Sequence, residues 1–446
     1  MADLPTVFDE QPLSVTPRKT WFPLYARIAM AVVLGVILGV AYGKAPYLPG
    51  GTFGNVELGR LTLLVVTLLK TLASPLIFFA VLDAFLRTEI TFERGGKLFF
   101  FSLVNVVAAM TIGLFVMNIW RPGQTWRGKF EESARIARAE GGEELQETEP
   151  ITVVESVRKA IPTSIVQPFV EGNLLGVILL AVLGGAALRA VRGVQQGRGT
   201  SAYLPIEQAV ETLYQVLIKM LEWVVLLVPL AVLGGVAQSV AETGAQTFRL
   251  VVTFLITMLA GLSIHAFGYY VLAAWLYGRK SPLAFLRAGF EPFLTGLSTN
   301  SSLVTVPVTL KALTERLGVS DQSARLSTCV GTNFNNDGIT LYEAMAAIFV
   351  AQAVGLEQSL GVQINAVIVC VLASLGSAGI PQSGLVMLPL VLAATGLSSE
   401  TINIAWPLIT AVDWIIARYR SGVNVLGDMT VAVQLDRSRG DVNTSP

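Results

Sequence analysis

Polar residues gather at four places in the otherwise apolar last third of this 446-residue sequence. Three are short runs, Ser298–Ser302, Asn333–Gly338 and Ser374–Pro381, and the fourth is a set of single residues on the last apolar segment. Lipid cannot solvate groups of this kind, so we expect them to line a cavity with protein walls. A polar cavity at membrane depth is typical of proteins that hold an ion or a solute, which indicates a transporter or a channel.

The last apolar segment carries a polar stripe that helical spacing places on one face. Its members are Asp413, Ala417, Arg420, Ser421, Asn424 and Asp428. An arginine inside a membrane costs several kcal/mol unless it has a partner. We therefore expect Arg420 either to pair with a protein carboxylate, for instance that of Asp413, or to face an anionic solute. Its planar guanidinium is well suited to a carboxylate.

Oxygen donors near this stripe favour a monovalent or otherwise hard cation. The side chains concerned are those of Asn335, Asp337, Asn424 and Asp428, and broken helices would add carbonyl groups from Gly331, Asn333 and the Ser374–Ser377 turn. With a single histidine, His265, a Cys/His metal cluster and a Ser–His hydrolase are both hard to build. We expect His265 to be a packed polar residue rather than a proton relay.

Composition places the chain among multi-span α-helical membrane proteins. It is 53% hydrophobic and 14% charged, whereas soluble proteins carry roughly 25% charged residues, and apolar runs long enough to span a bilayer recur along it. The formal net charge is zero, which implies no acidic or basic partner such as a nucleic acid. Cys329 and Cys370 both lie in apolar segments and suggest no disulfide framework.

Six ordinary spans are predicted before residue 280, at 21–42, 58–86, 98–120, 170–191, 207–238 and 247–277. Lysine and arginine are concentrated in the loops after the second, fourth and sixth spans, which places residues 1–20 in the cytoplasm as an N-terminal tail. The predicted location is the cell inner (plasma) membrane. Segment 121–165 is polar and is expected to be an extracellular insertion, as a surface loop in preference to a regulatory element.

The rest of the chain follows a different plan. Segments 281–315 and 361–396 are each interrupted by a polar run, which predicts two re-entrant helical hairpins, and full spans follow each at 322–352 and 402–434. A hairpin followed by a span, twice over, is typical of inverted repeats around a site at the midplane. The alternative is a pair of kinked ordinary spans. The predicted fold is an all-α membrane protein with eight transmembrane helices and two re-entrant hairpins.

Several of these motifs resemble the dicarboxylate/amino acid:cation symporter family, the glutamate transporter homologues. Asn335-Asn336-Asp337-Gly338 is similar to the family's Asn-Met-Asp-Gly-Thr motif, and the run from Val423 to Asp428 resembles the end of the family's last helix. The hairpin run 373–381 and the serine-rich stretch that ends at Pro307 also match. The resemblance extends over residues 21–434.

The resemblance implies a homotrimer in a lipid bilayer that works as an elevator-type transporter. Helices of 21–92 and 166–240 would form a fixed scaffold, while 93–120 and 241–434 would form a mobile transport domain, followed by a tail at 435–446. The second hairpin would act as a gate.

The same resemblance implies three sodium sites. Gly331, Asn335, Asn424 and Asp428 would hold one ion, and backbone oxygens of Asn333, Ser374, Leu375 and Ser377 would hold another. Asn335 and Asp337 would contribute to a third, whose remaining family ligands fall at Ser102, Asn105 and Val106 and match poorly. The retained Asp428 favours sodium, with proton coupling left open.

The substrate positions depart from the amino-acid-carrying members at one residue. Those members bind the substrate amine with an aspartate one turn before the key arginine, and Ala417 stands there in this sequence. The resemblance assigns substrate contacts to this position and to Arg420, Asn424, Ser301 and Ser302. Arg418, Ser421 and Gly384 are further candidates for substrate binding, and Arg418 adds a positive charge near the stripe. A buried ammonium without a partner costs several kcal/mol, so a small anionic dicarboxylate such as succinate is the predicted solute.

Three other functions remain as alternatives. One is a sodium-coupled carrier of an acidic or neutral amino acid, whose amine would be held by hairpin carbonyls and Asp413. Another is a sensor or anion channel built on the same scaffold, and the most distant is a membrane hydrolase.

Overall fold

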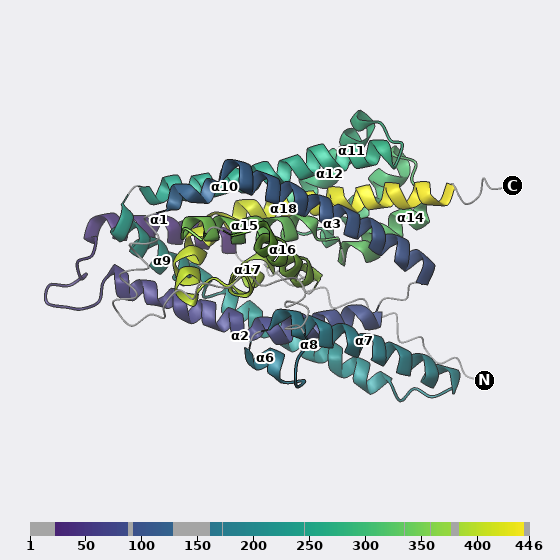
Figure 1. Ribbon diagram of the computed structural model, residues 1–446, viewed down its shortest axis with the longest axis horizontal. Coiled ribbons are helices and arrows are strands. Elements are labelled where there is room, and N and C mark those ends of the chain that lie inside the picture. Colours follow the sequence, from purple (N-terminus) through teal and green to yellow (C-terminus); the bar gives the residue numbers. More distant parts are fainter. Residues whose placement is uncertain are drawn as a thin grey trace.

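The computed structural model describes residues 23–87, 92–127, 161–171, 173–244, 246–333, 335–356, 358–375 and 383–440. Over these residues the secondary structure is helical, apart from an isolated bridge between Pro46 and Gly54. Figure 1 shows α2, α7 and α8 along one side of the molecule and α3, α10, α12 and α18 along the other, with α15, α16 and α17 between them.

The six predicted apolar spans are confirmed. Helices long and apolar enough to cross a membrane cover Leu24–Tyr42, Asn55–Asp83, Gly95–Trp120, Gly176–Gly197, Leu204–Glu242 and Val251–Leu276. The elements that contain them are α1 (Leu24–Tyr42), α2 (Asn55–Arg87), α3 (Phe92–Trp120), α7 (Leu174–Gly197), α8 (Leu204–Val225), α9 (Val228–Thr243), α10 (Gln246–Ser263), η2 (Ile264–Tyr269) and α11 (Tyr270–Leu276). The fifth span is divided just before Pro229, and the sixth contains a π-helical turn, η2.

Small residues allow the first group of helices to pack closely. α1 contacts α9 at Gly35 and Gly39, where an added Cβ would lie 2.9 Å from the carbonyl oxygen of Leu233 and 2.7 Å from Cβ of Val240. α2 packs against α9, α7 and α8. Lipid supplies no hydrophobic force between helices, so close backbone approach of this kind is how membrane helices gain contact energy.

The second group is arranged around the long helix α18 (Ser399–Gly440). α12 (Pro282–Thr299), α10 and α15 (Asp337–Ala353) pack against it, and α17 (Ser383–Ala394) lies between it and α2. The two groups meet where α9 approaches α18. At Gly235 of α9 an added Cβ would lie 2.3 Å from the ring of Pro407.

Each predicted interruption coincides with a helix end. α12 ends at Thr299, and Asn300 adopts the left-handed conformation with φ of 55°. The chain then returns through η3 (Leu303–Thr305), α13 (Val306–Lys311) and η4 (Ala312–Arg316). The next segments are α14 (Asp321–Arg325), η5 (Leu326–Val330) and η6 (Gly331–Asn333). The second interruption follows α16 (Leu360–Leu375), and its tip at 376–382 lies outside the described residues.

Segment 121–165 is described only at its ends. The helix η1 (Pro122–Trp126) packs against α15 and α10, and the short helix α6 (Gln167–Glu171) precedes α7. The predicted extracellular insertion otherwise lies outside the described residues.

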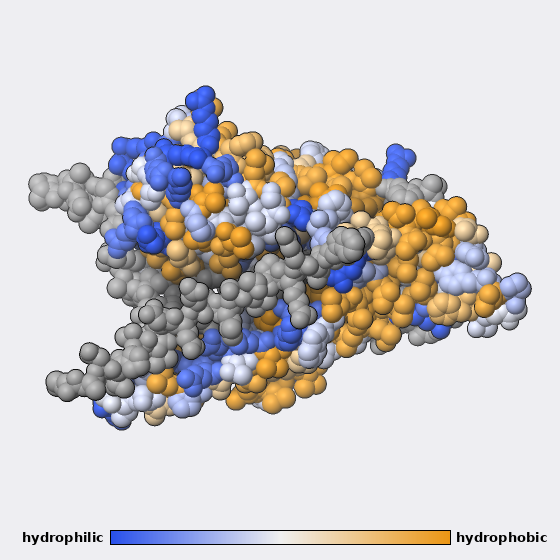
Figure 2. Space-filling view, turned by 180° about the vertical axis from the view of Figure 1, so that it is seen from behind, coloured by the Kyte–Doolittle hydropathy of each residue, from blue (hydrophilic) through white to orange (hydrophobic). Residues whose placement is uncertain are grey.

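The surface is divided by polarity. In Figure 2 hydrophobic side chains cover the right-hand part of the visible face, and hydrophilic ones gather toward the left. Exposed apolar side chains such as Leu34, Ile37 and Val40 of α1 belong to the predicted spans. An apolar surface of this extent is expected where lipid replaces water as solvent.

Replacing Gly234 with alanine should destabilise the packing of α9 on α2. The new Cβ would lie 2.1 Å from the carbonyl oxygen of Leu58, which belongs to the α2 backbone and cannot rotate away. Overpacking of this kind costs about 1–3 kcal/mol. Gly193→Ala on α7 is the matched control, because no atom lies within 4 Å of its added Cβ. The melting temperature of the detergent-solubilised protein should fall for Gly234→Ala, and equal values for both variants would contradict this packing.

Candidate functional site

The polar stripe of α18 is buried in the protein. Asp413, Arg420, Asn424 and Asp428 are 1%, 4%, 4% and 3% exposed. Because α10, α12, α15 and α17 surround α18, each of these side chains faces protein rather than the outer surface. This burial is what we expect if the stripe lines a region with protein walls.

Arg420 is held by three neighbours. Its Nη1 donates to Oδ1 of Asp413 at 3.1 Å, and its guanidinium carbon lies 4.1 Å from the ring centroid of Tyr342 on α15. On the third side Gly384 of α17 brings its backbone so close that an added Cβ would lie 2.2 Å from Nη2. The pair with Asp413 that the sequence allowed is therefore formed. It uses Nη1, and a guanidinium has several further N–H donors.

Asn424 connects the stripe to the start of α15. Its Oδ1 accepts a hydrogen bond of 2.9 Å from the backbone N–H of Gly338, and its Nδ2 lies 3.5 Å from Oδ1 of Asn336. A Cβ at Gly338 would lie 2.8 Å from Oδ1 of Asn424, so glycine is needed for this contact. One side chain thus joins the two motifs that the sequence singled out.

A cluster of buried oxygens lies one turn further along α18. Asp428 accepts a hydrogen bond of 3.2 Å from Nδ2 of Asn335, and Oδ2 of Asp337 accepts one of 2.9 Å from the hydroxyl of Tyr270. Oδ1 of Asn335 and Oδ1 of Asp337 are buried without a hydrogen-bond partner among the described residues. Buried acceptors are normally satisfied, and a small hard cation would satisfy these. The residues present therefore fit a sodium ion.

His265 is packed, as predicted, but it is not isolated from this cluster. Its ring stacks on Tyr269 at 5.2 Å between centroids, and its Nε2 lies 3.5 Å from Oδ2 of Asp337. Tyr269 in turn donates to Oδ1 of Asn105 on α3 at 2.8 Å. Asn105 and Asp337, two positions considered for a third sodium ion, thus both contact the stacked rings of Tyr269 and His265.

The tip of the first hairpin reaches α18 and the turn before α15. Ser302 accepts a hydrogen bond from Thr332 at 3.2 Å, and Ser421 donates to Oδ1 of Asn300 at 3.2 Å. The hydroxyl of Ser301 instead accepts from the backbone N–H of Val304. Both predicted serines are half-buried in this conformation.

Arg418 points away from Arg420, toward the first hairpin. Its Nη1 donates to the carbonyl oxygens of Leu297 and Ser298 at 3.3 and 2.7 Å, and its guanidinium lies 4.8 Å from the ring centroid of Tyr25 on α1. The side chain therefore satisfies carbonyls at the end of α12.

Backbone groups predicted to bind a cation lie at helix ends. The carbonyl oxygen of Gly331 accepts from the N–H of Asn335 at 2.8 Å, and Asn333 ends η6. Ser374 is buried in the last turn of α16, where its hydroxyl donates to the carbonyl of Val371, and Leu375 is the last residue of that helix. Ser377 lies outside the described residues.

Glu343 was not identified from the sequence. It lies on α15 next to Tyr342, is 0% exposed, and neither carboxyl oxygen has a hydrogen-bond partner among the described residues. Burying a charged carboxylate without a partner is costly. The available signal was a carboxylate within the apolar run that follows Gly338, because ionisable residues inside membrane helices are usually functional.

The six long apolar helices and the buried polar stripe are typical of a multi-pass membrane protein. The chain belongs to the sodium:dicarboxylate symporter family, whose model matches residues 24–438 and whose members are transporters, not enzymes. The family couples transport to cations, typically sodium, and membership implies the glutamate-transporter fold.

The chain is also similar to several proteins called excitatory amino acid transporters. It is 35% identical to one from Onchocerca volvulus over 61% of this chain and 53% of that protein. It is 31% identical to excitatory amino acid transporter 3 of Mus musculus over 75% and 62% of the two chains. Against the same transporter of Oryctolagus cuniculus the identity is 27% over 92% and 84%. The first two alignments thus span less than two thirds of the relatives' lengths.

Asp428→Asn should weaken stabilisation by sodium. A ligand that binds only the folded protein stabilises it in proportion to its affinity, and a tenfold loss of affinity removes about 1.4 kcal/mol at saturation. We expect the rise in melting temperature between choline chloride and sodium chloride to shrink in this variant. The control is Asp436→Asn, further along α18, where the carboxylate accepts a hydrogen bond from the backbone N–H of Ser320. An unchanged sodium response in Asp428→Asn would remove this residue from the cation site.

Proposed function

We propose that this protein is a secondary active symporter that couples sodium influx to uptake of a small anionic dicarboxylate. The observation that carries the proposal is the buried guanidinium of Arg420 on a helical face where Ala417 offers no carboxylate. Asp413 uses one N–H of Arg420, and the remaining N–H groups of the guanidinium would favour a carboxylate of the solute. When occupied, the cation site next to this face would supply positive charge that offsets the negative charge of the solute.

The two carboxylates of the solute would be bound by different groups. Arg420 retains donors beyond the Nη1 used by Asp413, and a carboxylate can accept two parallel hydrogen bonds from a guanidinium. The second carboxylate would be held by Asn424 and by the hydroxyls of Ser301, Ser302 and Ser421 at the first hairpin. Of these, Ser302 and Ser421 already lie on contacts between the hairpin and its neighbours.

Coupling would arise because Asn424 lies between the solute and the cations. Its hydrogen bond to Gly338 fixes the segment that presents Asn335 and Asp337. Sodium bound by Asn335, Asn424 and Asp428 would order this segment and so prepare the solute site. The remaining assigned ligands are Gly331, Asn333, Asp337, Ser374, Leu375 and Ser377. If protons were coupled to transport as well, the buried carboxyl group of Glu343 would be the candidate to carry them.

The movement would be of the elevator type. The scaffold would consist of α1, α2 and α7–α9, and the transport domain of α3 and α10–α18. Together the two parts would contain eight spans and two hairpins. The helices of each group pack mainly on one another, with contacts between the groups where α9 meets α18, α17 meets α2 and α16 meets α7, and this pattern supports the division. We further propose a homotrimer in the cell inner membrane with a cytoplasmic N-terminus, as the distribution of loop charges indicates.

A second candidate is a sodium-coupled carrier of acidic or neutral amino acids. The relatives named above carry amino acid transporter names. Asp413 offers a carboxylate seven residues before Arg420, and its Oδ1 already accepts from that arginine. An ammonium group would have to compete with the guanidinium for Asp413, which makes this the less favoured solute.

The direct test is uptake of labelled succinate and labelled aspartate into proteoliposomes, with and without an inward sodium gradient. We expect sodium-driven accumulation of succinate and little uptake of aspartate. Arg420→Lys keeps the charge but loses the planar fork, so succinate uptake should fall by about tenfold or more. Sodium-driven aspartate accumulation would select the second candidate. Current without accumulation would indicate a channel.

Ala417→Asp should shift preference toward amino acids. The new carboxylate gives an ammonium group a partner one helical turn from Arg420. Aspartate affinity should rise by about tenfold, equivalent to ~1.4 kcal/mol. The control is Ala417→Asn, whose side chain is nearly the same size as that of Ala417→Asp but carries no charge. It should leave the affinity for aspartate low. If the two variants bind aspartate equally, position 417 does not select the solute.

A further inference from the structure

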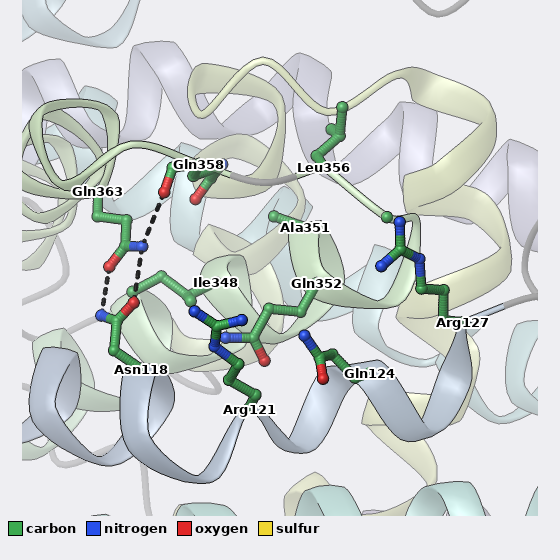
Figure 3. A pocket seen from close by; sticks show the side chains of 11 residues that line it. Asn118, Arg121, Gln124, Arg127, Ile348, Ala351, Gln352, Leu356, Gln358 and Gln363 are labelled. Atoms are coloured by element: carbon green, nitrogen blue, oxygen red, sulfur yellow. Dashed lines mark hydrogen bonds between the residues drawn. The ribbon is translucent and has the colours of Figure 1, made fainter.

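A cavity lies at the end of α3 opposite its Phe92 start, away from the stripe of α18. It has a volume of about 140 Å³ and is bordered by the last turn of α3, by η1, by the end of α15 and by the segment that leads into α16. Figure 3 shows the side chains of Arg121, Gln352 and Arg127 around it. A single water needs only ~10–15 Å³ on such a measure, so the cavity has room for a small solute.

The cavity carries positive charge. Arg121 and Arg127 both line it, and none of the lining residues that the structure describes is acidic. The other polar lining side chains are amides. Those of Asn118 and Gln363 spend their N–H groups on protein oxygens, so the guanidinium groups are the main donors to the cavity. This combination suits an oxyanion.

The two arginines are held on a fixed backbone. Between them, Gly123 donates its N–H to Oε1 of Gln352 at 3.1 Å, and Trp126 is fully buried, edge-on to Phe349 at 5.1 Å. A Cβ at Gly123 would lie 2.2 Å from the carbonyl oxygen of Phe349. η1 is therefore anchored to α15 at both its start and its end. Anchoring reduces the entropy lost when a ligand binds.

The backbone of Arg121 itself is unusual. Its φ of 41° and ψ of 50° place a non-glycine residue in the left-handed region, where such residues are uncommon. Pro122 follows and disfavours the right-handed helical conformation at this position, which turns the chain sharply at the end of α3. Backbone strain of this kind is concentrated at functional sites, here at a residue whose side chain lines the cavity.

The wall of the cavity also includes the start of the second hairpin. Asn118 of α3 and Gln363 of α16 exchange two amide hydrogen bonds of 2.6 and 3.0 Å, and Gln363 donates further to the carbonyl of Gln358 at 3.1 Å. A solute in the cavity would thus touch α3, α15 and the approach to α16 together.

We propose that this cavity is a second anion site, which binds a small oxyanion such as a carboxylate, sulfate or phosphate group between Arg121 and Arg127. The site is separate from the α18 stripe and does not depend on which solute the protein carries. The oxyanion could be free in solution or part of a lipid headgroup. Because it joins α3 and α15 to the segment before α16, its occupancy would stiffen the base of the second hairpin.

The test is calorimetric titration of inorganic sulfate into the full-length protein in neutral detergent, in sodium-free buffer. Arg121→Gln and Arg127→Gln should each raise the dissociation constant about tenfold. Arg121→Lys should retain part of the affinity, because the charge remains. The control is Arg249→Gln, which changes an exposed arginine of α10 outside the cavity and should bind like the parent. Equal affinity in the three glutamine variants, or no sulfate binding by the parent, would overturn the proposal.

A second arm distinguishes the source of the anion. The same titration is made in nanodiscs of phosphatidylcholine with and without phosphatidylglycerol. If a lipid phosphate occupies the cavity, phosphatidylglycerol should weaken sulfate binding by the parent but leave the Arg121→Gln variant unchanged. If the site takes free anions, the two lipid compositions should give the same affinity for the parent, still with a loss in Arg121→Gln.

Discussion

The structure depends on one costly group, a guanidinium buried among membrane helices. Arg420 would be unfavourable on α18 without Asp413 on its own helix, the ring of Tyr342 on α15 and the close backbone of Gly384 on α17. These contacts come from three elements, so the position of one charge specifies how α15, α17 and α18 are arranged. Under the proposed function the N–H groups of Arg420 that Asp413 does not use would also bind the solute, so that stability and selectivity would rest on one side chain.

The second organising contact is the start of α15. Gly338 donates to Asn424 and the neighbouring Asp337 accepts from Tyr270, so the turn before this helix is fixed from both α18 and α11. Oδ1 of Asn335 and Oδ1 of Asp337 in this turn are buried without hydrogen-bond partners among the described residues. A bound cation would coordinate these oxygens and so satisfy them. Under the proposed function this would link cation binding to the shape of the solute site.

Sequence reasoning predicted the parts that follow from periodicity and polarity. The six apolar spans and the helix end at Thr299 could be placed because lipid burial and polar interruptions leave strong local signals. The spacing of the α18 stripe correctly placed Asp413 within reach of Arg420. The direction of Arg418 could not be predicted, since it depends on carbonyls at the end of α12 and on Tyr25, both distant in the sequence. The proximity of His265 to Asp337 and the cavity at Arg121 depend on tertiary packing for the same reason.

The contact between Gly235 of α9 and Pro407 of α18 would influence how fast these two helices could move past each other. A glycine facing a proline ring presents neither a projecting side chain nor, on the proline, a backbone N–H that must be re-paired when the register changes. At this contact no side chain of residue 235 would have to be passed and no N–H hydrogen bond of residue 407 would have to be broken if one helix advanced along the other. If α18 moves past α9 in an elevator-type transport cycle, this contact would add little to the free-energy barrier of the movement. The main barriers would then arise at the polar tips of the hairpins.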